Sequence, residues 1–349
     1  MRLLLVTIAS NAVGYGHLNR CLSIAAHAQA AGAEIGFLLF GDEQARARVE
    51  TAGHSCRVRP ISELEQAIVT AESEAPADAV VSDLLHPAFF ARTRSPLTVF
   101  RQLRSLGRVV AAIDTLGDQS LVAQAPQADI DLMVIPYVAP AIDRGRGQWR
   151  LLQGAQYALL SSDYVDLPPR TARVRADRVL VSCGGSDPSG YTTVVLQGLE
   201  RMRERLQIRI VVGPLFSAAL RAQIGRLAAR SKHKVELVLA PESLLGEMLW
   251  CDLALAASGL TKYELAASGT PALLFSIDAS HDAINRPFAA MGSVLDLGEN
   301  VTPESVCEEA GKLLGDVARR AKMTTTGRKM VDARGAQRLL TEIRKELSC

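Results

Sequence analysis

The feature that most constrains the fold is an alternation of short apolar runs with longer segments of helical spacing. The first run, Leu3–Ile8, has no polar alternation, and the alanine-rich Leu18–Ala31 follows with apolar residues at helical spacing. Such runs, separated by helices, are typical of a parallel sheet covered on both faces. The first half therefore predicts a doubly wound α/β domain. Its other strands are expected at Ile35–Phe40, Cys56–Val58, Ala79–Leu85, Val109–Ile113 and Ile130–Tyr137, and its helices at Asp42–Ala52, Ser62–Glu74 and Pro96–Leu106.

The chain of 349 residues is long enough for two domains of ordinary size. Between Ala139 and Arg175 the sequence turns rich in Pro, Gly, Arg and Ser and loses periodicity, so we expect a linker there. The alternation resumes at Arg178–Ser182, and a helical tail is expected from Thr302. We predict two Rossmann-like domains, residues 1–163 and 164–349, facing each other across a cleft. The second-half elements are expected at Tyr191–Arg205, Ile208–Val212, Ser217–Arg230, Val235–Leu239, Leu244–Trp250, Leu253–Ala256, Thr261–Ala267 and Pro271–Ile277.

Composition excludes several classes of protein. The residues are 48% hydrophobic and 22% charged with a net charge of +2, which is typical of a globular protein and gives no basic field for nucleic acid. No apolar run is long enough to span a bilayer, and the first residues lack a charged leader. The six cysteines have no C-x-x-C spacing, as expected for reduced thiols. We therefore expect a cytoplasmic protein without a transmembrane segment.

Ligands of parallel sheets bind at the carboxyl ends of the strands, so the loops there are the places to look for chemistry. The first such loop, Val13–Cys21, follows an apolar strand and opens a helix, which directs N–H groups and a positive dipole end at an anion. His17 lies in this loop and can act as a general base near neutral pH. The alternative is that Gly14 and Gly16 only make a tight turn and His17 caps a helix.

Two loops in the second half have the same form. In the first, Gly184 and Gly185 let a ligand approach the backbone, with Ser186 and Asp187 behind them; alternatively, Asp187 is only the N-cap of the next helix. In the second, Ser258-Gly259 precedes a helix whose start is suited to a pyrophosphate.

Glu264 lies one turn into this last helix, within reach of a ribose whose two hydroxyls one carboxylate can accept. A capping box between Thr261 and Glu264 is the alternative, although it leaves Ser258-Gly259 unexplained.

Taken together, these motifs resemble the PseG/SpsG group, which includes the UDP-sugar hydrolase of pseudaminic acid biosynthesis and is related to the MurG-type glycosyltransferases. The resemblance rests on G-x-G-H-x-x-R-C-L at Gly14–Leu22, G-G-S-D at Gly184–Asp187 and S-G-x-T-x-Y-E-L at Ser258–Leu265. Weaker matches lie at Gly154–Leu160 and Val331–Arg338. The chain departs from the family in two places: Val6–Ser10 lacks an R-x-D, and Asp83–Pro87 lacks the family's aromatic pair and L-D.

The resemblance implies a GT-B fold, with UDP held mainly by the C-terminal domain and His17 as the catalytic base. It places Gly185 and Ser186 near phosphate, Ser258 and Gly259 at the pyrophosphate and Glu264 on the ribose. His281 and Asn285, from the segment Asp278–Asn285, are expected to touch the nucleotide sugar. The remaining substrate-binding residues are expected among the other motif positions: Gly14, Tyr15, Gly16, Asn19, Gly184, Asp187 and Thr261.

We therefore expect an enzyme that cleaves the anomeric C–O bond of a UDP-sugar with inversion, water being activated by His17. A PseG-like UDP-2,4-diacetamido-2,4,6-trideoxyhexose hydrolase is the specific form that the resemblance implies, in flagellin or surface-polysaccharide modification. An inverting glycosyltransferase with a hydroxyl acceptor is the alternative, and a silent nucleotide-sugar binding protein is a third. No cofactor or metal is expected, because Asp129 and Asp131 have D-x-D spacing but enter a strand. The sequence predicts no oligomeric state.

Overall fold

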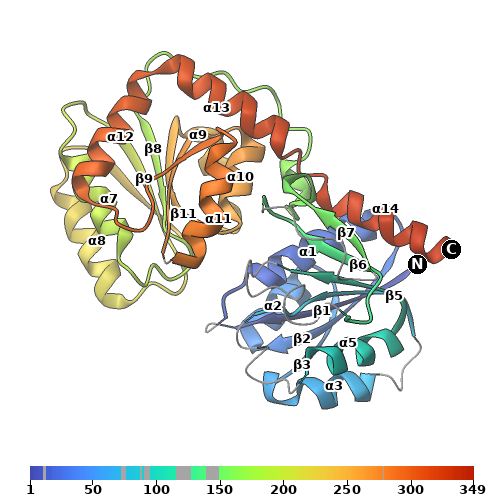
Figure 1. Ribbon diagram of the computed structural model, residues 1–349. Helices are drawn as coiled ribbons and strands as arrows, with labels where there is room; N and C mark the ends of the chain where they lie inside the picture. Colours follow the sequence, from blue (N-terminus) through green and yellow to red (C-terminus); the bar gives the residue numbers. More distant parts are fainter. Residues whose placement is uncertain are drawn as a thin grey trace. The chain divides into compact units, whose positions relative to one another are not determined.

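The computed structural model describes residues 1–10, 13–71, 76–86, 89, 95–114, 127–138, 149–277 and 279–349. It divides into two compact units, which are considered separately below (Figure 1). The first unit consists of Met1–Ser162 together with Ala333–Cys349, and the second of Asp163–Asp332. No helix in the described part of the chain combines the length and the hydropathy needed to cross a membrane.

A parallel sheet in the order β3-β2-β1-β4-β5-β6-β7 forms the centre of the first unit. Because all the paired strands run the same way, their carboxyl ends meet at one edge. The strands are β1 (Arg2–Ala9), β2 (Glu34–Gly41), β3 (Ser55–Arg59), β4 (Ala77–Asp83), β5 (Gly107–Ile113), β6 (Leu132–Ile135) and β7 (Arg150–Gln153). The helices are α1 (Gly16–Ala30), α2 (Glu43–Thr51), α3 (Leu64–Ala71), α5 (Pro96–Ser105) and α14 (Gly335–Ser348).

Both faces of this sheet are covered, as its apolar strands require. On one face Leu5 of β1 belongs to the same buried cluster as Ile24 of α1 and Leu339 of α14. Figure 1 shows α3 and α5 on the opposite side of the sheet from α1 and α14. Phe100 of α5 is fully buried. A strand that is enclosed on both faces gains nothing from polar alternation, which explains the uninterrupted apolar runs.

The second unit contains a parallel sheet in the order β10-β9-β8-β11-β12-β13. Helices cover both of its faces in Figure 1, with α7 and α12 on one side and α10 and α11 on the other. Its strands are β8 (Arg178–Ser182), β9 (Gln207–Val212), β10 (Lys234–Leu239), β11 (Leu253–Ala257), β12 (Ala272–Phe275) and β13 (Val294–Asp296). Its helices are α7 (Tyr191–Glu200), α8 (Ala218–Arg230), α9 (Leu245–Trp250), α10 (Thr261–Ser268), α11 (Ala279–Ala290), α12 (Pro303–Gly315) and α13 (Val317–Met330).

The predicted fold class of two doubly wound parallel sheets is confirmed, but two details differ from the expectation. The expected linker contains β7, which pairs with β6; four residues are too few to show a period in a sequence rich in Pro and Gly. The last helix, α14, belongs to the first unit and not to the C-terminal domain, because its apolar face packs on α1. Residues 139–148 of the expected linker and Asp278 lie outside the described residues.

The packing of α14 gives a stability prediction. Leu339 is fully buried between the helix and the first sheet, so Leu339→Ala should lower the free energy of unfolding of this unit by about 2–5 kcal/mol. Urea denaturation of the full chain measures the loss. Arg344→Ala changes an exposed residue of the same helix and should have little effect. Equal losses in the two variants would mean that α14 does not contribute to the core.

Candidate active site

His17 is the second residue of α1, at the carboxyl edge of the first sheet. The turn before it is closed by a hydrogen bond from the Gly14 N–H to the Ser10 carbonyl at 2.7 Å, and Gly14 has a φ of +86°. A residue with a Cβ is strained in this left-handed region, so glycine is needed here. The turn and the helix start together place the His17 ring over the end of β4.

Asp83, the last residue of β4, binds the His17 and Arg20 side chains of α1 and is itself fully buried. Its Oδ1 lies 2.7 Å from His17 Nδ1. Its Oδ2 accepts a hydrogen bond from Arg20 Nε at 2.7 Å, and Oδ1 accepts a second one from Arg20 Nη2 at 2.9 Å. His17 and Arg20 are 7% and 6% exposed, so all three groups interact away from bulk water. We call these three residues the His17 cluster.

The His17 cluster determines which ring nitrogen carries the proton. Nδ1 lies near both the Asp83 carboxylate, at 2.7 Å, and Arg20 Nη2, at 3.1 Å. A carboxylate can only accept, so the shorter contact requires a proton on Nδ1, and the Arg20 contact is then not a hydrogen bond. In the neutral ring the Nε2 lone pair is then available, and no described residue binds Nε2. This is the form of histidine that can accept a proton from a substrate.

The surroundings of the His17 cluster keep Asp83 ionised and the neighbouring His86 neutral. Burial acts to raise the pKa of Asp83, but the charge of Arg20 and the hydrogen bond from His17 outweigh burial and hold this pKa below its usual value. His86 contacts His17 edge to face, with ring centroids 5.7 Å apart. Burial is the main cause that lowers the pKa of His86 to about 4, so His86 is neutral at pH 7.

The other predicted residues of this loop have different surroundings. The Tyr15 hydroxyl donates to Gln44 Oε1 at 3.0 Å, and its ring lies under the Arg48 guanidinium, so Tyr15 is anchored to α2. Asn19 is exposed, and Gly16 begins the helix. Substrate contacts of Gly14, Tyr15, Gly16 and Asn19 stay predictions.

In the second unit, the predicted residues lie at the carboxyl ends of three adjacent strands, β8, β11 and β12. After β8, Gly184, Gly185 and Ser186 are exposed, and a Cβ on either glycine would meet no atom within 4 Å. Asp187 is buried; its Oδ1 and Oδ2 accept from the N–H groups of Tyr191 and Thr192 at 2.8 and 2.9 Å. Asp187 thus binds the first two N–H groups of α7, although the N-cap residue of this helix is Gly190 and not Asp187 as the alternative from the sequence has it. The open glycine backbone is the part that a ligand can approach, and contact of Asp187 with a substrate stays a prediction.

The turn after β11 is open to an anion. Gly259 has a φ of +123°, a backbone conformation that is strained for any residue with a side chain. Among the described residues, the N–H groups of Gly259, Leu260, Thr261 and Lys262 have no acceptor. The buried Ser258 Oγ likewise lacks a described partner. Helix starts with unsatisfied donors are common anion sites, so we call residues 258–262 the α10 turn.

Glu264 lies one turn further along α10. The considered capping box is not formed, because the N-cap of α10 is Leu260 and no side chain caps it. Glu264 is half-buried and its carboxyl group has no hydrogen-bond or ion-pair partner in the described part of the chain. Burial raises the pKa of Glu264 to about 7. A hydroxyl-rich ligand would supply the missing donors and favour the ionised carboxylate.

His281 and Asn285, which the sequence predicts as contacts of the nucleotide sugar, lie on α11 after β12. Asn285 is fully buried; its Oδ1 accepts from Lys262 Nζ at 3.0 Å and its Nδ2 donates to Ser276 Oγ at 2.9 Å. Its amide is thus already used inside the protein. His281, near the start of α11, is partly exposed. Contact of either residue with a nucleotide sugar stays a prediction.

Sequence reasoning did not select Asp83, Arg20, His86 or Lys262 as site residues. Asp83 and His86 were noted only as a departure from the family pattern, and Arg20 only as part of a motif. The signal that could have found Asp83 is its place as the polar residue that ends a buried parallel strand, where loops with chemistry begin. Lys262 gave no signal, because a lysine in the first turn of a helix is usually exposed.

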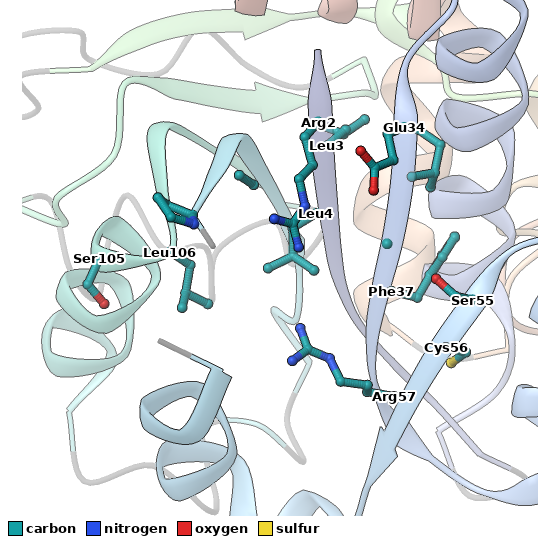
Figure 2. Close-up of a pocket in the computed structure, with 14 residues that line it drawn as sticks. Arg2, Leu3, Leu4, Glu34, Phe37, Ser55, Cys56, Arg57, Ser105 and Leu106 are labelled. Atoms are coloured by element: carbon teal, nitrogen blue, oxygen red, sulfur yellow. The ribbon is translucent and has the colours of Figure 1, made fainter. Parts of the chain in front are cut away.

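A cavity of about 250 Å³ lies at the opposite, amino-terminal edge of the first sheet (Figure 2). Its lining includes Arg2, Glu34, Arg57 and Ser105, from the starts of β1 and β2 and from β3 and α5. Because it lies away from the carboxyl edge and His17, we do not assign the site to it.

No group of three or more potential metal ligands occurs among the described residues. The D-x-D pair is paired with arginine: Arg104 binds Asp129 at 3.1 Å and Asp131 at 2.7 Å. Asp131 also accepts from the Val110 N–H at 2.7 Å. Both aspartates precede β6, which begins at Leu132, and both are bound by Arg104.

Comparison with solved structures defines the class of fold. MurG of Acinetobacter baumannii superposes with a TM-score of 0.68 at 16% identity, covering 99% of this chain and 100% of that one. The S. aureus MnaA–UDP co-structure gives 0.67 at 14% identity and covers 100% and 97%. With the two parallel sheets, these likenesses define a two-domain α/β protein of the GT-B type, as predicted.

Two proteins are related in sequence. The chain is 25% identical to the spore coat polysaccharide biosynthesis protein SpsG of Bacillus subtilis over 197 residues, 56% of this chain and 58% of that protein. It is 22% identical to the uncharacterized protein MJ1062 of Methanocaldococcus jannaschii over 286 residues, 78% of this chain and 55% of that protein. The matches thus span little more than half the length of each relative. No protein-family model matches the chain.

The His17 cluster predicts a pH-dependent loss of stability. Asp83→Asn leaves Arg20 buried without its counter-charge, so the free energy of unfolding should fall by about 3–5 kcal/mol near neutral pH. Because the folded-state pKa of Asp83 is depressed, by the neighbouring charges against burial, its contribution is present above the unfolded pKa of about 4. The difference between variant and wild type should therefore shrink as the pH falls below about 4.

Urea denaturation at a series of pH values measures this difference. Ser82→Ala removes a neighbouring buried hydroxyl that has no described partner, and should cost much less. A difference between Asp83→Asn and wild type that stays constant to low pH would contradict the assignment.

Proposed function

We propose that this protein is a UDP-sugar-dependent enzyme that cleaves the anomeric C–O bond of its substrate with inversion. The observation that carries the proposal is the His17 cluster, in which a buried carboxylate holds the imidazole with a free Nε2. Mere binding of a nucleotide does not need such an oriented base. The motif resemblance to the PseG/SpsG group and the fold shared with the MnaA–UDP co-structure support the choice of UDP.

The second unit provides the groups that the nucleotide needs. In the proposal, the α10 turn receives the diphosphate through its unpartnered N–H groups and Ser258 Oγ, and the glycine backbone at Gly184 and Gly185 approaches it from β8. The Glu264 carboxylate accepts hydrogen bonds from the two ribose hydroxyls. Backbone donors of this kind stabilise the negative charge that develops on the leaving UDP, and each can lower the activation barrier by roughly 3 kcal/mol.

The first unit provides the base. His17 Nε2 takes a proton from the attacking oxygen, which bonds to C1 on the face opposite UDP while the C1–O bond breaks. Asp83 holds the Nδ1 proton and stabilises the imidazolium that forms, as a buried carboxylate does in other histidine dyads. Arg20 keeps Asp83 in place through its two hydrogen bonds. The mechanism requires His17 and the α10 turn to act on one substrate molecule.

Water is our preferred acceptor, which makes the protein a UDP-sugar hydrolase of the PseG type. This choice rests on the motif resemblance and specifies a UDP-2,4-diacetamido-2,4,6-trideoxyhexose. A sugar, lipid or protein hydroxyl is the second candidate, favoured by structural neighbours such as MurG and the calicheamicin glycosyltransferase CalG4. The same base serves both reactions, so the acceptor is the only chemical difference. Localisation in the cytoplasm stays part of the proposal.

The acceptor is tested by supplying UDP-sugars, the trideoxyhexose among them, and following UDP and free sugar by NMR. Release of both products without an acceptor, with the anomer inverted, supports the hydrolase. Release only after a hydroxyl acceptor is added supports the transferase. Binding without turnover in either condition would contradict the proposal that the protein is an enzyme of this type.

Loss of the base should abolish turnover and spare nucleotide binding. We expect His17→Ala to lower kcat by about 10²–10⁴ while the Kd for UDP stays within about twofold of wild type. The matched control is His27→Ala on the same helix, where Nδ1 contacts the Ser23 carbonyl at 2.9 Å and the ring is also buried. If both variants lose the same activity, or His17→Ala keeps full activity, His17 is not the base.

Glu264 should control affinity for the nucleoside. Glu264→Gln should weaken uridine binding about tenfold or more, since hydrogen bonds to a charged acceptor are lost. Ribose hydroxyls favour the carboxylate, whose pKa burial raises to about 7 in the free protein, so wild-type affinity should fall as the pH drops below about 7.

Titration calorimetry at several pH values checks both effects. The variant should show no such pH dependence. Glu242→Gln, an exposed carboxylate of the same unit, is the control and should behave as wild type. Uridine affinity that is flat with pH in wild type would contradict the role of Glu264.

A further inference from the structure

Lys262, the second residue of α10, is buried without a counter-ion. Lys262 is 3% exposed, and its Nζ donates a hydrogen bond to the Asn285 amide oxygen at 3.0 Å. No described residue forms an ion pair with it. A buried ammonium bonded only to a neutral amide costs free energy, so packing alone gives no reason for a lysine at this position.

The groups around the amine leave it short of negative charge. The rings of Tyr263 and Phe288 lie 5.5 and 5.6 Å from Nζ. Asp296, at the end of β13, acts on the amine through its charge without contacting it. Asp282 on α11 is already paired with Arg286 at 2.5 Å. Burial lowers the pKa of Lys262 to about 7 against the opposing charge of Asp296, so uncharged amine is abundant near neutral pH.

The amine lies at the sheet edge that carries the α10 turn. Asn285 joins Nζ to Ser276, which directly follows β12, and the Ser258 N–H bonds the last carbonyl of β12 at 3.2 Å. Lys262 is itself the last residue of the α10 turn, so Nζ lies no further from one of the unpartnered N–H groups, its own, than the length of its side chain. At that separation, and away from bulk water, a charge on Nζ acts strongly on an anion in the turn.

We propose that Lys262 is a further ligand-binding residue, whose amine provides the positive charge for the diphosphate received by the α10 turn. The inference rests on the proposed function, since the diphosphate is that of UDP. In the free protein the Lys262 amine donates a hydrogen bond to Asn285 and is partly unprotonated. When the anion binds, the Nζ lone pair takes a proton from solvent and the resulting ammonium is stabilised by the two phosphates. The protein thus acquires the charge only where the ligand can compensate it.

Lys262→Met tests this role, because it keeps the stem and removes the amine. Titration calorimetry at about pH 8 compares UDP, inorganic pyrophosphate and uridine as probes. We expect the Kd for UDP and pyrophosphate to rise about tenfold or more and the Kd for uridine to stay within about twofold. Lys234→Met, an exposed lysine of the same unit, should bind all three as wild type does. Replacing an uncompensated buried amine should leave the unfolding temperature of the free protein unchanged or higher.

Proton linkage gives a second measurement. In buffers of different ionisation enthalpy at about pH 8, wild type should take up close to one proton per UDP, whereas Lys262→Met should take up none. Glu264 contributes little at this pH because it is already ionised above its pKa of about 7, which burial raises to that value. Asn285→Asp, nearly identical in shape, places a carboxylate on Nζ and should also abolish the uptake. This variant keeps the inference testable if Lys262→Met does not fold.

The outcomes separate the two proposals. Equal losses for uridine and UDP, or no loss for UDP, would overturn the role of Lys262, as would proton uptake that persists in Lys262→Met and Asn285→Asp. If wild type binds pyrophosphate but not UDP, the proposed function fails, while Lys262→Met still decides the role of the amine with pyrophosphate. If wild type binds neither probe, both proposals fail.

Discussion

Parallel pairing of the strands is the constraint on which the other features depend. Since every paired strand of both sheets runs the same way, all loops that follow strands emerge at one edge of each sheet. In the first unit this edge brings the end of β4 under the start of α1, and so Asp83 under His17. In the second it brings the turns after β8, β11 and β12 side by side. The sites consist of residues distant in sequence because strand order differs from chain order.

The two units treat buried charge in opposite ways. In the first, Asp83 binds both His17 and Arg20, so the charges compensate each other and the cluster is complete without a ligand. In the second, Glu264 and Lys262 lie on one helix, partly or fully buried, and neither forms an ion pair with a described residue. Paired charges suit a base that must keep one orientation. Uncompensated groups suit a binding surface, because a ligand gains the free energy that the free protein lacks.

Sequence reasoning succeeded where one short segment contains the whole signal. The α/β class, most element positions and the glycine turns before α1 and α10 follow from local patterns, which the fold respects. It was incomplete where a partner is distant. A local pattern predicts Asp187 as the N-cap of the next helix, but the N-cap is Gly190, and Asp187 reaches the N–H groups of Tyr191 and Thr192 from outside the helix. The contacts of the Asn285 amide with Lys262 and Ser276 likewise join residues that no local pattern connects. The place of α14 depends on contacts with α1, more than 300 positions away in the chain.

The sequence by itself determined the periodicities, the punctuation by glycine and proline, and the presence of a histidine in one strand-to-helix turn, because these depend on neighbours a few residues apart. The tertiary structure decided which charges meet. It placed the Asp83 carboxylate on His17 Nδ1, which leaves Nε2 able to accept a proton, and it buried Lys262 without a counter-ion. Protonation and charge depend on burial and on distances of a few ångströms between separate elements, and a linear pattern contains neither.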